Sequence, residues 1–232
     1  MTEDGRAFFT IPRLAEMSWL VHSFGHAGWS EGSFLDFAAS KGLQPVIMRQ
    51  IHSDVIHCLE AAPAGKLEGD ALMTNVPGLL LVVRTADCLP VFLVDEKNRA
   101  VASVHCGWRG TQKRILEKTV LAMGRAYGSG PSGLLGALGP CIGPACYEVG
   151  AEVKESFGAA GFPDAVFKPV PGRAGKYLLD LRRANVWLLG ELGLKRSNVW
   201  SADTCTHCDP GLLSYRRNRG EPRRMYNFVG IR

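Results

Sequence analysis

Long uninterrupted apolar runs are absent from this sequence, and that absence argues against a membrane protein. The longest apolar stretch, residues 78–95, is interrupted by Arg84 and Asp87, and such charges are costly at the middle of a bilayer. The first ten residues also lack the basic start and long apolar segment of a secretion signal. We therefore expect a cytoplasmic protein with no membrane partner, in which residues 78–95 form two buried strands.

The cysteine pattern lacks the features of a disulfide framework. The seven cysteines are an odd number, at positions 58, 88, 106, 141, 146, 205 and 208, and without a secretion signal we expect them to stay reduced. Cys205 and Cys208 form a CxxC, but no second CxxC is present to complete a zinc ribbon, and Pro210 follows where a redox pair would require a helix. We interpret this segment as a loop near the functional site, and Cys146 as an inert buried thiol.

A strong charge of one sign is absent too, because the formal net charge is only +5. The basic residues are spread along the chain except for one C-terminal cluster, Arg216, Arg217, Arg219, Arg223 and Arg224. Aromatic residues, which a surface for single-stranded nucleic acid would need, are too few around this cluster. We therefore expect no nucleic-acid partner and interpret the cluster as a solvated face, with phosphate contact by Arg216 or Arg217 as the alternative.

Neither repeats nor low-complexity linkers divide the chain, and its 46% hydrophobic content suffices for a core, so we expect one domain over residues 1–232. Short apolar segments rich in β-branched residues predict strands at 45–50, 54–60, 79–85, 89–95, 100–106, 134–139, 198–203 and 226–231. Strand runs with helices between them predict an α+β layered fold with a mixed sheet.

Three segments have helical periodicity, at residues 111–128, 147–158 and 180–193. In the first, we expect one buried face made by Ile115, Thr119, Ala122 and Ala126, and Gly128 as the C-cap. In the last, Asp180 is the expected N-cap and Gly193 lies just past the end.

Side chains that bind metals occur at three predicted strand ends or breaks, namely His52, Cys88 and His105. A strand fixes the direction of such a side chain, and the adjoining loop admits a substrate. Two imidazoles and one thiolate suit Zn²⁺, with copper as the competitor, and three protein ligands leave a fourth position open, as in catalytic sites. A metal held there can lower the pKa of a bound water to about 7 or polarise a substrate atom.

Several neighbours of these residues are candidates for supporting roles. Asp70 and Asp87 could act as general acid or base or orient an imidazole ligand, and turn capping is the alternative. Cys141 lies in a Gly/Pro-rich segment whose backbone could approach a ligand, so it is a candidate for lining the pocket.

Basic and amide side chains also lie next to the expected ligands. Arg49 and Gln50 immediately precede His52, and Arg109 follows His105 after three residues. These side chains could clamp a phosphate or a substrate edge. Surface solvation is the alternative for each of them.

Seven segments, in order along the chain, carry a family resemblance: RQIHSDVI, GDALMT, TADCLPVFLVD, VHCGWRGT, GPCIGPACYEVG, DTCTHC and SYRR. The sequence resembles the YfiH-like laccase-domain family over about residues 44 to 217, and motifs as long as GPCIGPACYEVG are hard to obtain by chance. Members are described either as multi-copper polyphenol oxidases or as zinc-dependent purine nucleoside phosphorylases with adenosine deaminase activity. The resemblance implies an α/β/β/α sandwich and carries the family's metal ligands onto His52, Cys88 and His105.

From this resemblance we expect a zinc enzyme that phosphorolyses adenosine, inosine or methylthioadenosine and deaminates adenosine. The expected catalytic residues are His52, Cys88, His105 and Asp70, and the expected substrate contacts are Arg49, Gln50, Arg109, Cys141 and Arg216. The partners would be a purine nucleoside and phosphate, and the protein would be a monomer or weak oligomer.

Other functions are kept as alternatives. A copper-dependent polyphenol oxidase (laccase) would need several coppers, for which six histidines are few. A peptidoglycan-precursor editing hydrolase would use Cys88 as its nucleophile with His105, a metal-free pair also suggested by the family's likeness to cysteine hydrolases. A non-catalytic binding module would tolerate a Cys88→Ser change.

Two segments depart from the family pattern. The N-terminal loop of the family carries an arginine in an F-x-T-R-x-G-G context, whereas His26 occupies that place here. The family's closing Thr-Gly-Arg segment is replaced by RRMYNFVGIR, in which Arg224 is the candidate substitute. The part of the site that these segments form in relatives is therefore expected to differ in this chain.

Overall fold

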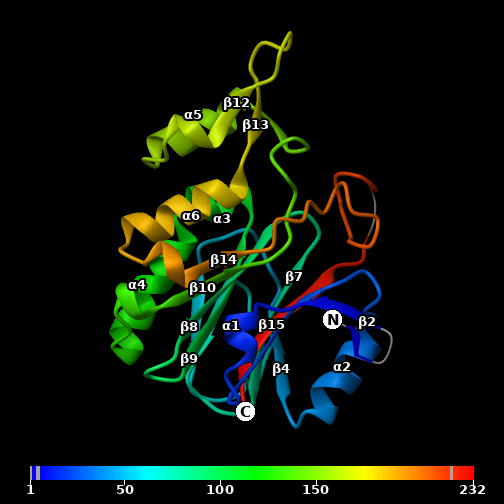
Figure 1. Ribbon diagram of the computed structural model, residues 1–232, viewed down its shortest axis with the longest axis vertical. Helices are drawn as coiled ribbons and strands as arrows, with labels where there is room; N and C mark the ends of the chain where they lie inside the picture. The colour runs from blue at the N-terminus through cyan, green and yellow to red at the C-terminus, as the bar shows by residue number, and fades with distance from the viewer. Residues whose placement is uncertain (1, 4–5, 220–221) are drawn as a thin grey trace.

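The structure is a computed structural model that describes residues 2–3, 6–219 and 222–232, so residues 1, 4 and 5 of the N-terminal stretch lie outside the description. Two six-stranded sheets account for most of the described strands (Figure 1). The first has the strand order β1 (Thr2–Glu3), β2 (Arg6–Phe9), β3 (Leu20–Gly25), β15 (Met225–Ile231), β7 (Leu79–Thr85) and β4 (Gln44–Ile47). The second has the order β14 (Val199–Ser201), β10 (Leu135–Leu138), β8 (Leu89–Asp95), β9 (Ala100–Cys106), β6 (Ala71–Thr74) and β5 (Ile56–Leu59).

Both sheets are mixed. In the first, β4 runs parallel to β7 while β3 and β7 flank β15 antiparallel to it. In the second, β5 pairs parallel with β6 and β14 pairs parallel with β10, around an antiparallel centre. A small third sheet has the order β11 (Glu148–Gly150), β13 (Lys176–Leu179) and β12 (Phe167–Pro169).

The helices are α1 (Pro12–Ala15), α2 (Glu31–Ser40), α3 (Trp108–Gln112), α4 (Ile115–Tyr127), α5 (Ala151–Ala159) and α6 (Leu181–Glu191). The predicted end signals are confirmed for the two longest. Gly128 adopts the left-handed conformation that ends α4, and the Asp180 side chain accepts a hydrogen bond from the Arg183 amide at the start of α6. None of the described helices combines the length and apolarity needed to cross a bilayer.

Central strands are apolar on both faces because each of their faces packs against a different layer. In β8, Phe92 and Val94 point into the core between the two sheets, while Val91 and Leu93 contribute to the core under α4 and α6. Phe24 from the first sheet stacks on Phe92 from the second, with ring centroids 4.4 Å apart.

The outer face of the first sheet is covered by α2, whose Phe34 stacks on Tyr226 of β15. The outer face of the second sheet is covered by α4 and α6 (Figure 1). The layers therefore follow the order α/β/β/α, and the predicted α+β sandwich is confirmed.

Some local predictions were wrong. Ala126 is exposed, because the buried face of α4 continues through Met123 instead and ends one turn earlier. Residues 148–150, predicted as helix, form β11 because they pair with β13, so the helix begins only at Ala151. The strand β4 spans 44–47 and so includes only residues 45–47 of the predicted strand 45–50, and Arg49 makes only an isolated bridge to Glu68.

Candidate metal and active site

The candidate site lies where the chain passes from one sheet to the other. Cys88 is in the short connection between the end of β7 in the first sheet and the start of β8 in the second. His105 lies on β9, opposite Pro90 of β8, and His52 is in the loop that follows β4. The possible ligand atoms of these three residues all lie within 4.8 Å of one another. The structure thus brings together residues that are far apart in the sequence.

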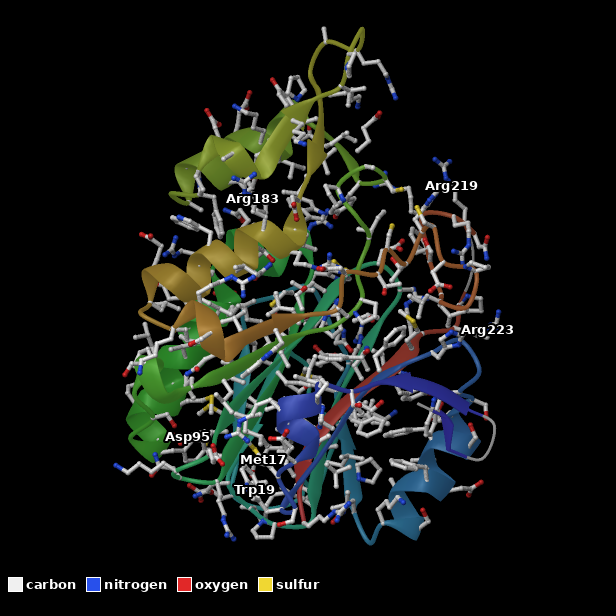
Figure 2. The ribbon with its side chains drawn as sticks, viewed as in Figure 1. Met17, Trp19, Asp95, Arg183, Arg219 and Arg223 are labelled. Atoms are coloured by element: carbon white, nitrogen blue, oxygen red, sulfur yellow. The ribbon has the colours of Figure 1, made fainter. Side chains whose placement is uncertain are left out.

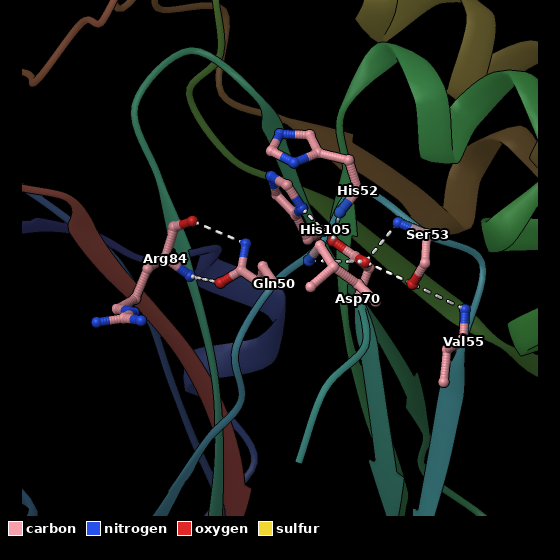
Figure 3. Close-up of polar contacts among 8 residues, drawn as sticks. Gln50, His52, Ser53, Val55, Asp70, Arg84 and His105 are labelled. Carbon is pink, nitrogen blue, oxygen red and sulfur yellow. Dashed lines mark hydrogen bonds and ion pairs between the residues drawn. The ribbon is translucent and has the colours of Figure 1, made fainter. Parts of the chain in front are cut away.

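Asp70 lies next to His52 and His105 and forms hydrogen bonds with both of them (Figure 3). Its carboxylate is fully buried and accepts hydrogen bonds from His105 Nδ1 at 2.8 Å and from the His52 amide at 3.1 Å. The Ser53 amide and hydroxyl each donate to it at 2.6 Å. Because Asp70 accepts from Nδ1 of His105, the Nε2 atom is the one available as a ligand. Asp70 is therefore placed to orient His105, whereas its burial keeps it from contacting a substrate.

The charges of these groups stabilise one another. Burial opposes ionisation of Cys88, but the positive charge of His105 and hydrogen bonds from His105 and His52 outweigh it and lower the Cys88 pKa to about 6. Burial likewise works against protonation of His105, but the Cys88 charge and the Asp70 hydrogen bond raise its pKa to about 9. Against the cost of burial, hydrogen bonds from His105 and Ser53 hold the pKa of Asp70 at about 2. Without a metal, the favoured state is a thiolate beside an imidazolium.

The backbone around the group adopts unusual conformations. His52 has a φ of 56° and Asp87 a φ of 95°, values that non-glycine residues rarely adopt. Gly107 allows the closest approach, because a Cβ there would lie 3.0 Å from Cys88 Sγ and 3.2 Å from His52 Cδ2. The VHCGWRGT motif therefore has a glycine where the side chains of the group need room.

The group lines a cavity of about 650 Å³. Arginine residues also line it, namely Arg49, Arg84, Arg216 and Arg224, together with the aromatic residues Tyr147 and Tyr215. Burial raises the pKa of the Tyr147 phenol, which keeps its proton as a hydrogen-bond donor. A cavity with several guanidinium groups and protonated phenol is suited to a substrate that carries negative charge.

The predicted contacts next to His52 both line the cavity and also have structural partners. Arg49 forms an exposed ion pair with Glu68 at 2.6 Å. The Gln50 side chain both donates to and accepts from the backbone of Arg84, which ties the His52 loop to β7 (Figure 3). Gln50 is therefore held firmly in place, with its amide already engaged.

Of the other predicted substrate contacts, only Arg216 lines the cavity. Arg216 lines it, with its guanidinium 5.3 Å from the centre of the Tyr147 ring. Arg109 is exposed, stacks on Trp108 and is not among the residues that line the cavity. Cys141 is buried with its pKa raised to about 12 by burial, and it too is outside the lining.

Asp87 and Arg217 have structural partners. Asp87 accepts hydrogen bonds from the Thr206 hydroxyl at 2.7 Å and from the Arg216 amide at 2.6 Å. Arg217 donates to the carbonyl oxygens of residues 206, 207, 209 and 212, which leaves it committed to the loop that contains them. Asp87 lines the cavity and Arg217 does not. Of the two arginines, Arg216 is the one placed for phosphate contact, and its Nη1 also donates to the Glu148 carbonyl at 3.1 Å.

Further along the basic cluster, Arg219 and Arg223 are exposed on the same side of the molecule (Figure 2). Arg224 comes back to the cavity rim, with its guanidinium 5.9 Å from the centre of the Tyr215 ring. The divergent N-terminal loop lies next to this region, because the Ala27 amide donates to the Gly211 carbonyl. His26 thus faces the segment after the CxxC and is absent from the cavity lining.

Sequence reasoning missed several residues that line the cavity, among them Arg84, Tyr147 and Tyr215. Arg84 was taken only as an interruption of an apolar run, although a charged residue in a strand that is otherwise buried could have indicated a site. Tyr147 lies in the GPCIGPACYEVG motif, directly after Cys146. The prediction of a buried Cys146 was wrong, because this thiol is partly exposed and its Sγ lies 3.4 Å from that of Cys208.

Comparison with known proteins shows similarity over most of the chain. The model of the family described as multi-copper polyphenol oxidoreductase laccase matches residues 33–232. A purine nucleoside phosphorylase of Deinococcus radiodurans is 36% identical over 184 residues, which cover 79% of this chain and 69% of that protein. The purine nucleoside phosphorylase YfiH of Escherichia coli K12 is 35% identical over 190 residues, which cover 81% and 74%.

Solved structures with the same architecture are also similar. The hypothetical protein YfiH of Bacillus licheniformis superposes with a TM-score of 0.90 and 25% identity, covering 99% of this chain and 98% of the other. YlmD of Geobacillus stearothermophilus superposes with a TM-score of 0.87 and 25% identity, covering 100% and 98%. The similarity therefore includes the N-terminal residues that the sequence motifs did not cover.

Proposed function

Because this chain belongs to the multi-copper polyphenol oxidoreductase laccase family, whose curated relatives are named purine nucleoside phosphorylases, we propose that it is a zinc-dependent purine nucleoside enzyme. The proposed reactions are phosphorolysis of adenosine, inosine or methylthioadenosine and deamination of adenosine. The observation that carries the proposal is the meeting of His52, Cys88 and His105 in an arginine-lined cavity.

The donor set fits Zn²⁺. Two imidazoles and a thiolate within 4.8 Å of one another are a donor set that would suit this ion, and all three residues line the cavity. Asp70 fixes the orientation of His105, as carboxylates commonly do for histidine ligands of zinc. A bound Zn²⁺ would act as a Lewis acid toward a substrate oxygen or nitrogen.

The arginines would position phosphate for phosphorolysis. In this reaction a phosphate oxygen bonds to the anomeric carbon of the ribose while the bond from that carbon to the purine nitrogen breaks, and the purine leaves with the electron pair. Arg84 and Arg216 come from different segments of the chain, both line the cavity, and both would bind the anion. Arg49 also lines the cavity, but its side chain is largely exposed and pairs with Glu68.

Aromatic residues would recognise the base. Tyr215 is 54% exposed at the cavity and offers a flat face for stacking on a purine. Tyr147 keeps its proton because burial raises its pKa, so its hydroxyl can donate a hydrogen bond to a purine nitrogen as negative charge develops there.

Two alternatives have different requirements. A multi-copper oxidase needs histidine ligands for several metal ions, but the candidate metal groups among the described residues include only His52 and His105. A hydrolase with Cys88 as nucleophile is favoured by the low pKa of that thiol beside His105, and it would work without metal. Release of an amino acid from a muropeptide precursor would identify the editing activity.

The test is a paired assay of wild type and Cys88→Ala, with Cys58→Ala as a matched control because Cys58 is exposed and outside the site. Each protein receives adenosine or inosine, with and without phosphate, and adenine, hypoxanthine and ammonia are followed by chromatography alongside metal content. Removing a residue that orients a metal ligand commonly lowers activity about 10- to 100-fold, and removing the ligand itself should cost more. We therefore expect Cys88→Ala to lower kcat/KM by more than about 100-fold.

The outcomes separate the functions. Phosphate-dependent release of base by wild type and Cys58→Ala, with a lowered zinc content only in Cys88→Ala, supports the proposal. Zinc binding without turnover of any nucleoside contradicts the substrate assignment. Cys88-dependent hydrolysis that persists after removal of metal favours the thiol hydrolase.

A further inference from the structure

A second group of three metal-binding side chains lies outside the candidate active site. Cys146 ends a Gly/Pro-rich loop (residues 139–147) that follows β10, and Cys205 and Cys208 belong to a loop (residues 202–217) that follows β14. The three sulfur atoms lie within 4.8 Å of one another, and this group shares no member with the first one. The sequence alone did not indicate this group, because Cys146 is about 60 residues from the CxxC next to which it lies in the structure.

Backbone hydrogen bonds hold the two loops in register at this point. The Thr206 amide donates to the Cys141 carbonyl at 3.0 Å, beside an isolated β-bridge between Cys141 and Cys205. The Gly143 amide donates to Cys205 Sγ at 3.0 Å, an interaction that favours the thiolate form. Within the CxxC, the amides of Cys208 and Asp209 donate to the Cys205 carbonyl, which closes a turn. These bonds fix the backbone of the two loops relative to each other, and one of them holds the Cys205 sulfur directly.

The sulfur geometry is close to that of a zinc site. Tetrahedral zinc with Zn–S bonds of about 2.3 Å places its sulfur ligands about 3.8 Å apart. The 3.4 Å separation of Cys146 and Cys208 and the 4.8 Å limit for all three pairs lie on either side of that value. A disulfide between Cys146 and Cys208 would leave unexplained the third sulfur, which is held beside them by an amide. Three thiolates are also a softer donor set than the first group, with no imidazole.

We propose that Cys146, Cys205 and Cys208 bind a second zinc ion, which links the 139–147 loop to the 202–217 loop. Cys208 is exposed, so the fourth position would be filled by water or another solvent-borne ligand. This site is separate from the proposed nucleoside chemistry, and the proposal stands whichever substrate the enzyme uses.

The link would steady one wall of the active-site cavity. Tyr147 follows Cys146 directly, and Arg216 lies in the same loop as the CxxC, and both residues line the cavity. Asp87, the neighbour of Cys88, contacts both loops, through the Ile142 amide at its carbonyl and the Thr206 hydroxyl at its carboxylate. A metal that holds the loops together would therefore preserve the position of groups around Cys88.

The experiment measures zinc per chain in protein purified under reducing conditions. Wild type is compared with Cys208→Ser, Cys88→Ser, the double variant and Cys58→Ser, the last being a matched change at an exposed cysteine that is in neither group. We expect about two zinc ions in wild type and Cys58→Ser, about one in each of Cys208→Ser and Cys88→Ser, and none in the double variant.

A spectroscopic measurement tests for the second metal site even if Cys208→Ser does not fold. Cobalt is added to chelator-treated Cys88→Ser, and the near-ultraviolet absorption from thiolate-to-cobalt charge transfer is followed. Saturation of a strong thiolate band at one cobalt per chain supports the proposal. The proposal is overturned if cobalt gives no thiolate band in this variant, if Cys208→Ser keeps the full zinc content of wild type, or if peptide mapping shows a stable Cys146–Cys208 disulfide under the same conditions.

Discussion

The two groups of metal-binding side chains are built on different supports. His52, Cys88 and His105 lie at the ends of strands or in connections between sheets, with the fully buried Asp70 behind them. Cys146, Cys205 and Cys208 lie on two loops at the surface, where backbone amides are their neighbours. The first group borders a cavity of about 650 Å³, and none of the second lines it.

This difference suggests how each group works. Although burial opposes ionisation, the positive charge of His105 and hydrogen bonds from His105 and His52 lower the Cys88 pKa to about 6, so the first group is ready to bind a metal or to react. In the second group a thiol lies beside other thiols, and burial and these neighbours raise the Cys146 pKa to about 12. The first arrangement is typical of a reactive centre, and the second of a structural link in which the Cys146 thiol ionises when metal binds.

Among the changes that test the difference between the two groups, Asp70→Asn is expected to have the largest effect on zinc affinity. This change removes the charge that orients His105, so we expect zinc affinity at the first group to fall about 10- to 100-fold and the second group to be unaffected. Competition with a chelator measures both affinities. Asp54→Asn, at a carboxylate that pairs with Lys118 on the surface, is the matched control and should change neither. Equal losses at both groups would show a general folding defect instead.

Arginines at the cavity offer a second test. Replacing Arg84 or Arg216 with Leu should raise the KM for phosphate about tenfold or more, since each loses a charged hydrogen bond to the anion. Zinc content at both groups should stay the same. Arg125→Leu, an exposed change on α4, serves as the control. An unchanged KM for phosphate in both variants would separate the arginines from substrate binding.

The pH dependence of thiol alkylation distinguishes the groups in metal-free protein. A pKa lowered to about 6 means that the Cys88 thiolate forms above that pH, so its alkylation by iodoacetamide should rise about tenfold from pH 5 to pH 7 and then level off. Cys146 should still be accelerating at pH 9, because its pKa is raised. Peptide mass spectrometry gives both rates. A Cys88 midpoint near 9 would contradict the influence of His105.

The smallest effect is expected from Thr206→Val, which removes the hydroxyl that links the CxxC loop to Asp87. We expect a stability loss of about 1–3 kcal/mol in urea unfolding and a drop in kcat/KM of less than about fivefold, with both zinc ions retained. Thr119→Val removes a buried hydroxyl from α4 and should lower stability alone. Equal effects of the two variants on kcat/KM would show that the contact with Asp87 does not support the site.

Local patterns were sufficient for the centre of the fold. The strands 79–85, 89–95 and 100–106 have the bounds that their apolar runs predicted, because both faces of each strand are covered and most of their residues are therefore apolar. The caps of α4 and α6 were equally clear, since a left-handed glycine and an N-cap aspartate act within one turn. Residues 148–150 were assigned wrongly because only pairing with β13 makes them a strand.

The sequence by itself determined the types of residue available at the site and the runs of strands with helices between them that predict an α+β layered fold. It also carried the family motifs, because they are contiguous in the chain. Only the tertiary structure decided that Asp70 is hydrogen-bonded to His105, that Arg84 lines the cavity and that Cys146 lies next to Cys208 of the CxxC. These relations join residues 35 to 62 positions apart, and their contacts depend on how strands pair and loops meet, which no local pattern of side chains encodes.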